Sequence, residues 1–169
     1  MNFDMSKEKD IKTNAMRMLE RAGVSYEVTT YECDEFTDGV SVAQKLGIPE
    51  EQTFKTLVTV GKSGNHYVFV IPVAEELDLK KAAKSVGEKS VEMIHVKDLL
   101  GLTGYIRGGC SPVGMKKQFA TVIDESAGSF ESIYVSGGRI GSQIKLCTDD
   151  LVKVTRGRLS DIVFVSDDK

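Results

Sequence analysis

The sequence predicts a single mixed α/β domain, with a curved or barrel-like mixed sheet flanked by short helices. Its 169 residues suit one domain, and its shares of hydrophobic (41%) and charged (28%) residues are typical of globular proteins. Short β-rich runs are interspersed with short segments of helical spacing, without the even strand–helix rhythm of a doubly wound fold. We therefore expect one domain over residues 1–169, with its core between about residues 10 and 163.

Near the start of the chain, apolar residues recur at helical spacing from Ile11 to Ala22. Gly23 follows, and glycine suits the left-handed position after a helix. The other elements expected here are a strand over residues 26–31, a loop over 34–39, and a short helix capped by Ser41 and ended by Gly47.

The strongest local signal is a β-hairpin. Two apolar, β-rich runs at 53–60 and 67–73 are joined by a turn rich in Gly, Ser and Asn. Next, Asp78 is placed to cap a helix over 79–86 that Gly87 ends. The remaining expected elements are strands at 91–94, 121–123, 132–135 and 144–147, a short helix at 96–100 ended by Gly101, and a last helix capped by Asp149.

Charge and composition narrow the function classes. The net charge of -3 argues against a generic nucleic-acid coat, so any RNA contact must use a local basic patch. The basic residues either form such patches or simply lie on a solvated face. They gather as Arg107, Lys116 and Lys117; as Arg139 and Lys145; and as Lys153, Arg156 and Arg158.

Location and metal binding are also constrained. No apolar run approaches the roughly 20 residues that a membrane helix needs. Residues 1–10 do not resemble a secretory signal, so we expect a cytoplasmic protein. The three cysteines, Cys33, Cys110 and Cys147, are odd in number and widely spaced, and neither of the two histidines neighbours them. We therefore expect neither a disulfide framework nor a metal site.

Two glycine pairs, Gly108-Gly109 and Gly137-Gly138, are each expected at a strand end and beside an arginine. Glycine allows a ligand to approach the backbone closely, and outward amide groups can hold a carbonyl oxygen or a phosphate. The alternative is two tight turns without a ligand. Repetition of the pattern keeps the binding interpretation open.

Two side chains are candidates for chemistry. Lys55 lies in the first hairpin strand on the same face as Leu57, so it either extends to solvent or places a cation in a pocket. Cys110 lies among glycines, near Arg107 and Lys116, where a thiol pKa can be lowered. A cysteine nucleophile usually needs a histidine base, and no spacing links one to Cys110, which favours a small buried residue instead.

Several segments together carry a family resemblance. The chain resembles the YbaK/EbsC-type aminoacyl-tRNA deacylases, which are related to the editing domain inserted in bacterial prolyl-tRNA synthetases. The resemblance covers residues from about 10 to 163. The matching segments are Thr13-Asn14-Ala15 through Tyr31, Phe54-Lys55-Thr56-Leu57, Leu79-Lys80-Lys81, Thr103-Gly104-Tyr105, Gly108-Gly109-Cys110-Ser111-Pro112-Val113-Gly114-Met115-Lys116-Lys117 and Tyr134-Val135-Ser136-Gly137-Gly138-Arg139.

The resemblance implies a hydrolase that removes misattached cysteine from tRNA(Pro), in which the substrate's own thiol attacks the ester and leaves as a cyclic thiolactone. It implies no cofactor, and it implies the acceptor end of aminoacyl-tRNA and prolyl-tRNA synthetase as partners. Lys55 would be the catalytic residue. The implied substrate-binding residues are Tyr31, Thr56, Gly108, Gly109, Cys110, Ser111, Pro112, Ser136, Gly137, Gly138 and Arg139.

The chain departs from the family pattern at two places. Members often carry two basic residues between the glycines of the second loop, whereas here Arg139 is followed by Ile140. Several members carry an aliphatic residue where this chain has Cys110, which argues against that thiol as the catalyst. Two other functions stay open: a deacylase for alanine or another small amino acid on tRNA, and a non-catalytic module that binds RNA ends or nucleotides.

Overall fold

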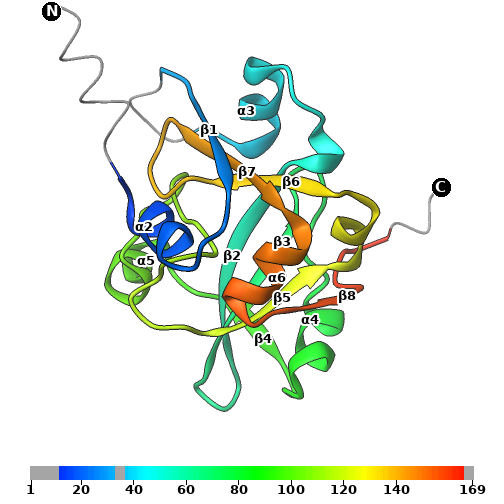
Figure 1. Ribbon diagram of the computed structural model, residues 1–169. Coiled ribbons are helices and arrows are strands. Elements are labelled where there is room, and N and C mark those ends of the chain that lie inside the picture. The colour runs from blue at the N-terminus through cyan, green and yellow to red at the C-terminus, as the bar shows by residue number, and fades with distance from the viewer. Residues whose placement is uncertain (1–11, 33–36, 166–169) are drawn as a thin grey trace, which may run out of the picture.

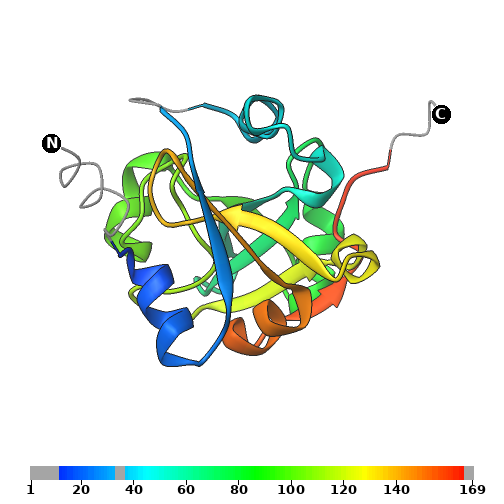
Figure 2. The ribbon, with the colours of Figure 1, turned by 45° about the horizontal axis from the view of Figure 1, so that its top comes forward.

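The computed structural model describes residues 12–32 and 37–165, so the predictions at Ile11, at Cys33 and at 34–36 lie outside the described residues. The strands form two sheets, and the smaller lies across the larger (Figures 1 and 2). The smaller, antiparallel sheet has the order β1 (Tyr26–Thr30), β7 (Ser142–Cys147), β6 (Ser132–Ser136). The larger, mixed sheet has the order β4 (Val91–Met93), β2 (Phe54–Gly61), β3 (His66–Pro72), β5 (Ala120–Asp124), β8 (Arg158–Ser160).

Short helices cover these sheets. Within the described residues there are five α-helices, and none of them is long and apolar enough to cross a membrane. They are α2 (Asn14–Arg21), α3 (Gly39–Leu46), α4 (Leu79–Val86), α5 (Val96–Thr103) and α6 (Thr148–Thr155), with single 3₁₀ turns η1 (Glu50–Gln52) and η2 (Glu125–Ser129).

The predicted class, one mixed α/β domain with short helices, is confirmed, but the curved or barrel-like sheet is wrong. The two sheets are open, and an isolated parallel bridge between Thr53 and Tyr134 joins them. Among the described residues, β6 pairs with β7 along its whole length but meets the start of β2 only through this isolated bridge. The sheets therefore pack against each other instead of closing into a barrel.

The centre of the larger sheet is buried on both faces. Alternate residues of β3 enter two different cores, as the two-residue period of a strand requires. Val68 and Val70 pack in the core between the two sheets, whereas Phe69 and Ile71 pack in a second core with Ala82 and Ala83 of α4. This double burial explains why β3 is apolar almost throughout.

Local signals set most elements, and some were misassigned. The β2–β3 hairpin is confirmed, as is Asp78, whose side chain accepts hydrogen bonds from the backbone N–H groups of Lys80 and Lys81, both at 3.0 Å. Ser41 is not the cap of α3. Asp38 is the cap, because its carboxylate accepts the Ser41 N–H at 2.9 Å.

Three other assignments are wrong. Helix α5 continues through Gly101 and ends at Gly104, whose φ of +86° suits a helix end. Asp149 lies in the first turn of α6, which has Cys147 at its N-cap and no side-chain cap. The strand expected to lead into Gly108-Gly109 is absent, since residues 105–107 form no strand; the short strand β8 was not anticipated.

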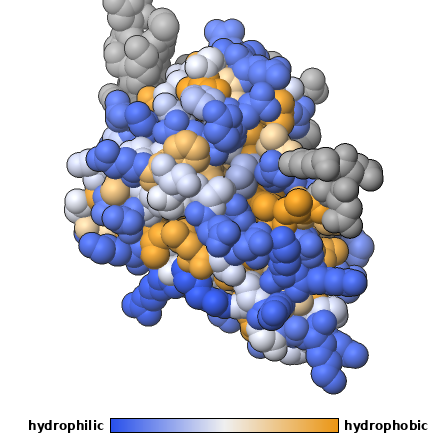
Figure 3. Space-filling model, turned by 90° about the vertical axis from the view of Figure 1, so that its right-hand side faces the viewer, coloured by the Kyte–Doolittle hydropathy of each residue, from blue (hydrophilic) through white to orange (hydrophobic). Residues whose placement is uncertain are grey.

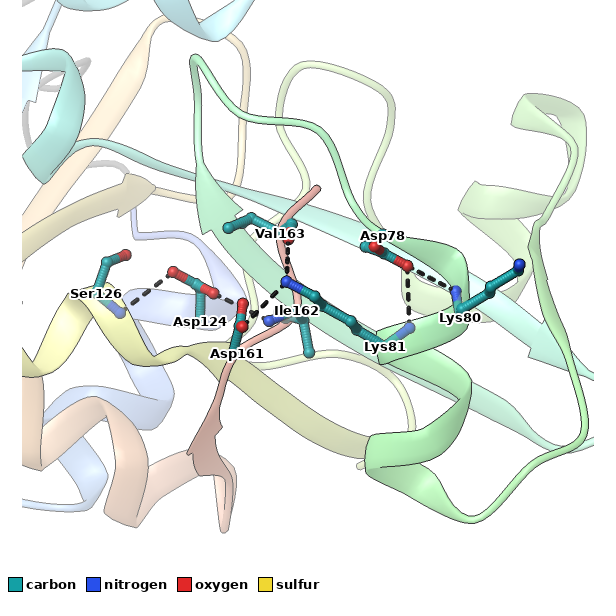
Figure 4. Close-up of polar contacts among 8 residues, drawn as sticks. All are labelled: Asp78, Lys80, Lys81, Asp124, Ser126, Asp161, Ile162 and Val163. Carbon is teal, nitrogen blue, oxygen red and sulfur yellow. Dashed lines mark hydrogen bonds and ion pairs between the residues drawn. The ribbon is translucent and has the colours of Figure 1, made fainter. Parts of the chain in front are cut away.

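A buried carboxylate holds the C-terminal part of the chain on the larger sheet (Figure 4). Asp124, at the end of β5, accepts hydrogen bonds from the N–H of Ser126 at 3.2 Å and of Ile162 at 3.1 Å. Ile162 is fully buried in the core beside α4. The carboxylate thus satisfies two backbone donors at a point where the chain leaves the sheet.

The same C-terminal segment pairs with the residues that follow β3. The Asp78 N–H donates to the Ile162 carbonyl and the Phe164 N–H to the Glu76 carbonyl, both at 2.8 Å. Lys81 of α4 donates to the Val163 carbonyl at 3.0 Å (Figure 4). These bonds fix the connection between β3 and α4, which lies beside Lys55.

Candidate active site

A cleft of about 530 Å³ opens between β2, the start of α3, the β4–α5 connection and the first glycine loop. Strand β2 contributes its residues 54–58, so the first strand of the hairpin forms one wall of the cleft. Six of the twelve predicted site residues line it: Tyr31, Lys55, Thr56, Gly108, Cys110 and Ser136.

The other six predicted residues are not part of the cleft wall. Ser111 is fully buried, and its hydroxyl accepts the Val113 N–H at 3.3 Å, so it holds the first loop in shape. The remaining five belong to the two glycine loops and are not among the described lining residues: Gly109, Pro112, Gly137, Gly138 and Arg139.

The two glycine loops support each other. A Cβ on Gly109 would lie 2.8 Å from both Arg139 Cα and Ile140 N, so only glycine permits this approach of the backbones. Gly138 has a φ of +103°, and the Thr13 hydroxyl donates to the Gly137 carbonyl at 2.5 Å. The second loop, which follows β6 as predicted, is thereby fixed against the start of α2.

The expected outward amide groups are divided between the loops. Gly109, Gly137 and Gly138 use their N–H groups internally, on the Ile106 carbonyl (3.0 Å), the Ser142 carbonyl (2.8 Å) and the Ser136 hydroxyl (3.2 Å) respectively. Gly108 and Cys110 line the cleft, and their N–H groups have no acceptor among the described residues. Only the first loop thus offers unoccupied amides at the cleft.

Lys55 places a cation in the cleft. Its side chain is half-buried, and burial lowers the pKa of the Lys55 ammonium below its usual value. The negative charges of Glu76, Asp38 and Glu75 oppose this shift. In the part of the chain that the structure describes, the ammonium forms neither a hydrogen bond nor an ion pair.

Two buried acceptors on the cleft wall also lack partners among residues 12–32 and 37–165. They are Thr56 Oγ1 and Gln143 Oε1. Gln143 pairs with Ser136 across β6 and β7, and only 7% of its surface is exposed. Gln143 was missed at the sequence level because the strand now seen as β7 was expected to begin at Ile144. The available signal was a polar residue directly before an apolar strand. Native proteins rarely leave buried polar atoms unpaired, so both atoms suit contact with a ligand.

Cys110 does not have the surroundings of a nucleophile. Burial raises the pKa of its thiol to about 12, so almost none of it is thiolate at neutral pH. His66 packs against the Phe119 ring at 5.7 Å, and His95 precedes α5. Neither histidine is among the described residues that line the cleft. Within the described residues, no group of three or more His, Cys, Asp or Glu could hold a metal ion.

Comparison with known proteins gives one consistent result. The sequence model of the protein family described as "Aminoacyl-tRNA editing domain" matches residues 36–154. An Enterococcus faecalis protein named "Putative Cys-tRNA(Pro)/Cys-tRNA(Cys) deacylase EbsC" is 49% identical over 160 residues, which cover 94% of this chain and 98% of that protein.

Solved structures agree with the sequence match. A crystal structure described as that of "a putative trans-editing enzyme for prolyl tRNA synthetase" has a TM-score of 0.80 at 26% identity, over 92% of this chain and 100% of that one. A second structure, of a protein described as hypothetical, has a TM-score of 0.81 at 24% identity, over 89% of this chain and 99% of that one, and supports the fold alone.

Proposed function

Because the chain belongs to the aminoacyl-tRNA editing domain family, we propose that it hydrolyses misacylated tRNA and that its substrate is cysteine attached to tRNA(Pro). The observation that carries the proposal is the Lys55 ammonium, half-buried in the cleft and without a hydrogen-bonding partner among the described residues. The negative charges of Glu76, Asp38 and Glu75 favour its protonated form, and such an ammonium can stabilise the negative charge that develops in the tetrahedral intermediate of ester cleavage.

The cleft walls suit the rest of the substrate. The amides of Gly108 and Cys110 are donors for the same developing oxyanion, as the carbonyl oxygen gains charge. Gln143 Oε1 and Thr56 Oγ1 are acceptors, and a cysteinyl ester offers them the N–H groups of its ammonium and a ribose hydroxyl. Tyr31 and Ser136 complete this wall.

We propose that the substrate provides the nucleophile. Its thiol loses a proton, its sulfur bonds to the ester carbonyl carbon, and the bond from that carbon to the ribose oxygen breaks. The ribose oxygen takes up a proton, and the product, a cyclic thiolactone, is later opened by water. A buried Cys110 and a cleft without a histidine among its described lining residues support this route. Holding the thiol next to its own carbonyl raises its effective concentration.

The proposed chemistry also explains selectivity. Proline differs little from cysteine in size, so a synthetase pocket gains only about 1–3 kcal/mol from shape. Proline has no thiol, and a cleft that depends on the substrate's sulfur leaves correctly charged tRNA intact. The tRNA acceptor end would approach past Arg107, which is exposed beside the first loop, and prolyl-tRNA synthetase is the partner we propose for delivery.

The test is hydrolysis of Cys-tRNA(Pro), Ala-tRNA(Pro) and Pro-tRNA(Pro) by wild type, Lys55→Ala and Lys62→Ala. Lys62 is an exposed lysine of the hairpin turn and serves as the matched control. We expect rapid release of cysteine alone, lost in Lys55→Ala and kept in Lys62→Ala. Rapid release of alanine would exclude the substrate-thiol route and favour a deacylase for small amino acids. Binding without turnover of any of these substrates would contradict an enzymatic function and favour a non-catalytic binding module.

A further inference from the structure

The mouth of the cleft has two unlike sides. Lys55 lies near three carboxylates, and one of them, Asp38, is itself on the cleft wall. Elsewhere on the cleft wall, Met93 at the end of β4 and Val96 at the start of α5 contribute apolar side chains, yet 46% and 59% of their surfaces are exposed. One side is therefore acidic and the other is apolar.

The apolar side extends along α5. Leu99 of this helix packs against the core, whereas Leu100, one turn after Val96, is 53% exposed. Residues four apart lie on the same helix face, so Val96 and Leu100 continue one surface outward from the cleft. Other apolar patches occur on the molecule, as Figure 3 shows for one face, so exposure alone does not mark a site. Continuity with the cleft distinguishes this one.

The proposed reaction places a nucleoside at this mouth. The scissile ester joins the amino acid to the ribose of the terminal nucleotide, so the base must lie within a few ångströms of an ester bound beside Lys55. A nucleobase has two apolar faces, and burying them against apolar side chains is favourable. The 5′ phosphate of the terminal nucleotide is repelled by carboxylates, which disfavours binding of the nucleotide at the acidic side.

We propose that Met93, Val96 and Leu100 form a binding surface for the terminal nucleobase of the aminoacyl-tRNA. This inference rests on the proposed function, since it assigns a place to the nucleoside of the same substrate. The surface is aliphatic, so it contacts the base without reading its identity by hydrogen bonds. Arg107, on the cleft wall, supplies positive charge for the adjoining phosphate.

The experiment compares three cysteine esters: Cys-tRNA(Pro), 2′(3′)-O-cysteinyladenosine and cysteine methyl ester, which lacks a nucleoside. In Val96→Ser with Leu100→Ser we expect kcat/KM to fall about tenfold for the first two esters and less than twofold for the methyl ester. Val28→Ser is the matched control, because Val28 is an exposed strand residue that is not on the described cleft wall. This control variant should leave kcat/KM unchanged for all three esters.

The outcomes separate this inference from the proposed function. An equal fall for all three esters would overturn the base surface, because it would mean a general distortion of the cleft. A fall seen only when prolyl-tRNA synthetase is present would assign the surface to a protein partner and overturn it as well. If wild type cleaves no ester, the proposed function fails, and binding of adenosine monophosphate then tests the base surface by itself. Binding that is weakened tenfold in the double variant would still support the base surface. Absence of binding would overturn it.

Discussion

The backbone of Arg139 occupies the space in which a side chain on Gly109 would begin, 2.8 Å from the position of its Cβ. The two glycine loops are therefore one unit: the first presents Gly108 and Cys110 to the cleft, and the second packs against it at Arg139 and Ile140. Since both backbones are fixed, the shape of the cleft wall depends on a contact that tolerates no added atom.

Gly109→Ala should separate the two loops. Backbone cannot move aside as a flexible side chain does, so we expect kcat/KM for Cys-tRNA(Pro) to fall at least tenfold and the free energy of unfolding to drop by about 1–3 kcal/mol. Steady-state deacylation and urea unfolding measure the two effects.

Gly101→Ala is the matched control for that substitution. Gly101 lies in α5 with a negative φ, and its Cβ would meet nothing within 4 Å. Alanine is favoured over glycine inside a helix by about 1 kcal/mol, so this variant should be as active as wild type and slightly more stable. Full activity in Gly109→Ala would refute the role of the loop contact.

The pH dependence of activity should follow the charges around Lys55. Burial lowers the pKa of Lys55, and Glu76, Asp38 and Glu75 partly restore it. Removing two of these charges, in Glu75→Gln with Glu76→Gln, should lower the pKa of Lys55 further. The ammonium then loses its proton at a lower pH, so the alkaline limb of the kcat/KM profile should move towards lower pH.

The size of that shift should depend on salt. Both glutamates are exposed, so their field is screened, and the shift should shrink as ionic strength rises. Glu92→Gln on β4 is the control, because Glu92 is exposed but does not act on the pKa of Lys55. A limb that moves to higher pH, or an equal shift in Glu92→Gln, would contradict this account.

The sequence predicted best those elements whose signals are local. The β2–β3 hairpin follows from a turn of Gly, Ser and Asn between two β-rich runs, and α4 from Asp78 before it and Gly87 after it. The cap of α3 was misassigned because Asp38 and Ser41, three residues apart, are both good caps, and only the fold decides which one accepts the bond.

The site was predicted only in part, for a related reason. Lys55 and Thr56 could be placed on a strand, but the pattern cannot show that Gln143 lies on the same cleft wall, since β7 pairs with strands distant in sequence. Likewise, the glycine pairs suggested two separate binding loops. Which of the amides are left unoccupied depends on turn hydrogen bonds, such as that from Gly109 to Ile106, that composition does not specify.

Cys110→Ala should leave deacylation within about threefold of wild type. The pKa of the thiol, raised by burial to about 12, keeps it protonated and unreactive at neutral pH. For the same reason, iodoacetamide at pH 8 should label native Cys110 far more slowly than the unfolded chain. Peptide mass spectrometry measures the labelling, and deacylation of Cys-tRNA(Pro) measures activity. Loss of activity in a folded Cys110→Ala would exclude the substrate-thiol route.

Asp124→Ala should loosen the C-terminal segment. The substitution leaves the N–H groups of Ser126 and Ile162 without their acceptor, which should cost about 2–3 kcal/mol in urea unfolding. Amide exchange at Ile162 should accelerate. Asp161→Ala is the control: its ion pair with Lys81 is solvent-exposed, so its loss should cost less than about 1 kcal/mol. Similar costs for the two variants would mean that the buried carboxylate has no special role.

Gln143→Leu should raise stability and lower activity together. The buried Oε1 has no donor among the described residues, and removing such an atom recovers about 1 kcal/mol or more of desolvation cost. If that oxygen accepts a hydrogen bond from the substrate, kcat/KM should fall at least tenfold. Gln118→Leu is the control, and it should lower stability, since the Gln118 amide donates hydrogen bonds to the carbonyls of Phe119 and Thr155. Thermal unfolding and deacylation distinguish them: a destabilised Gln143→Leu would show that Oε1 is satisfied within the protein, and full activity would remove it from the substrate site.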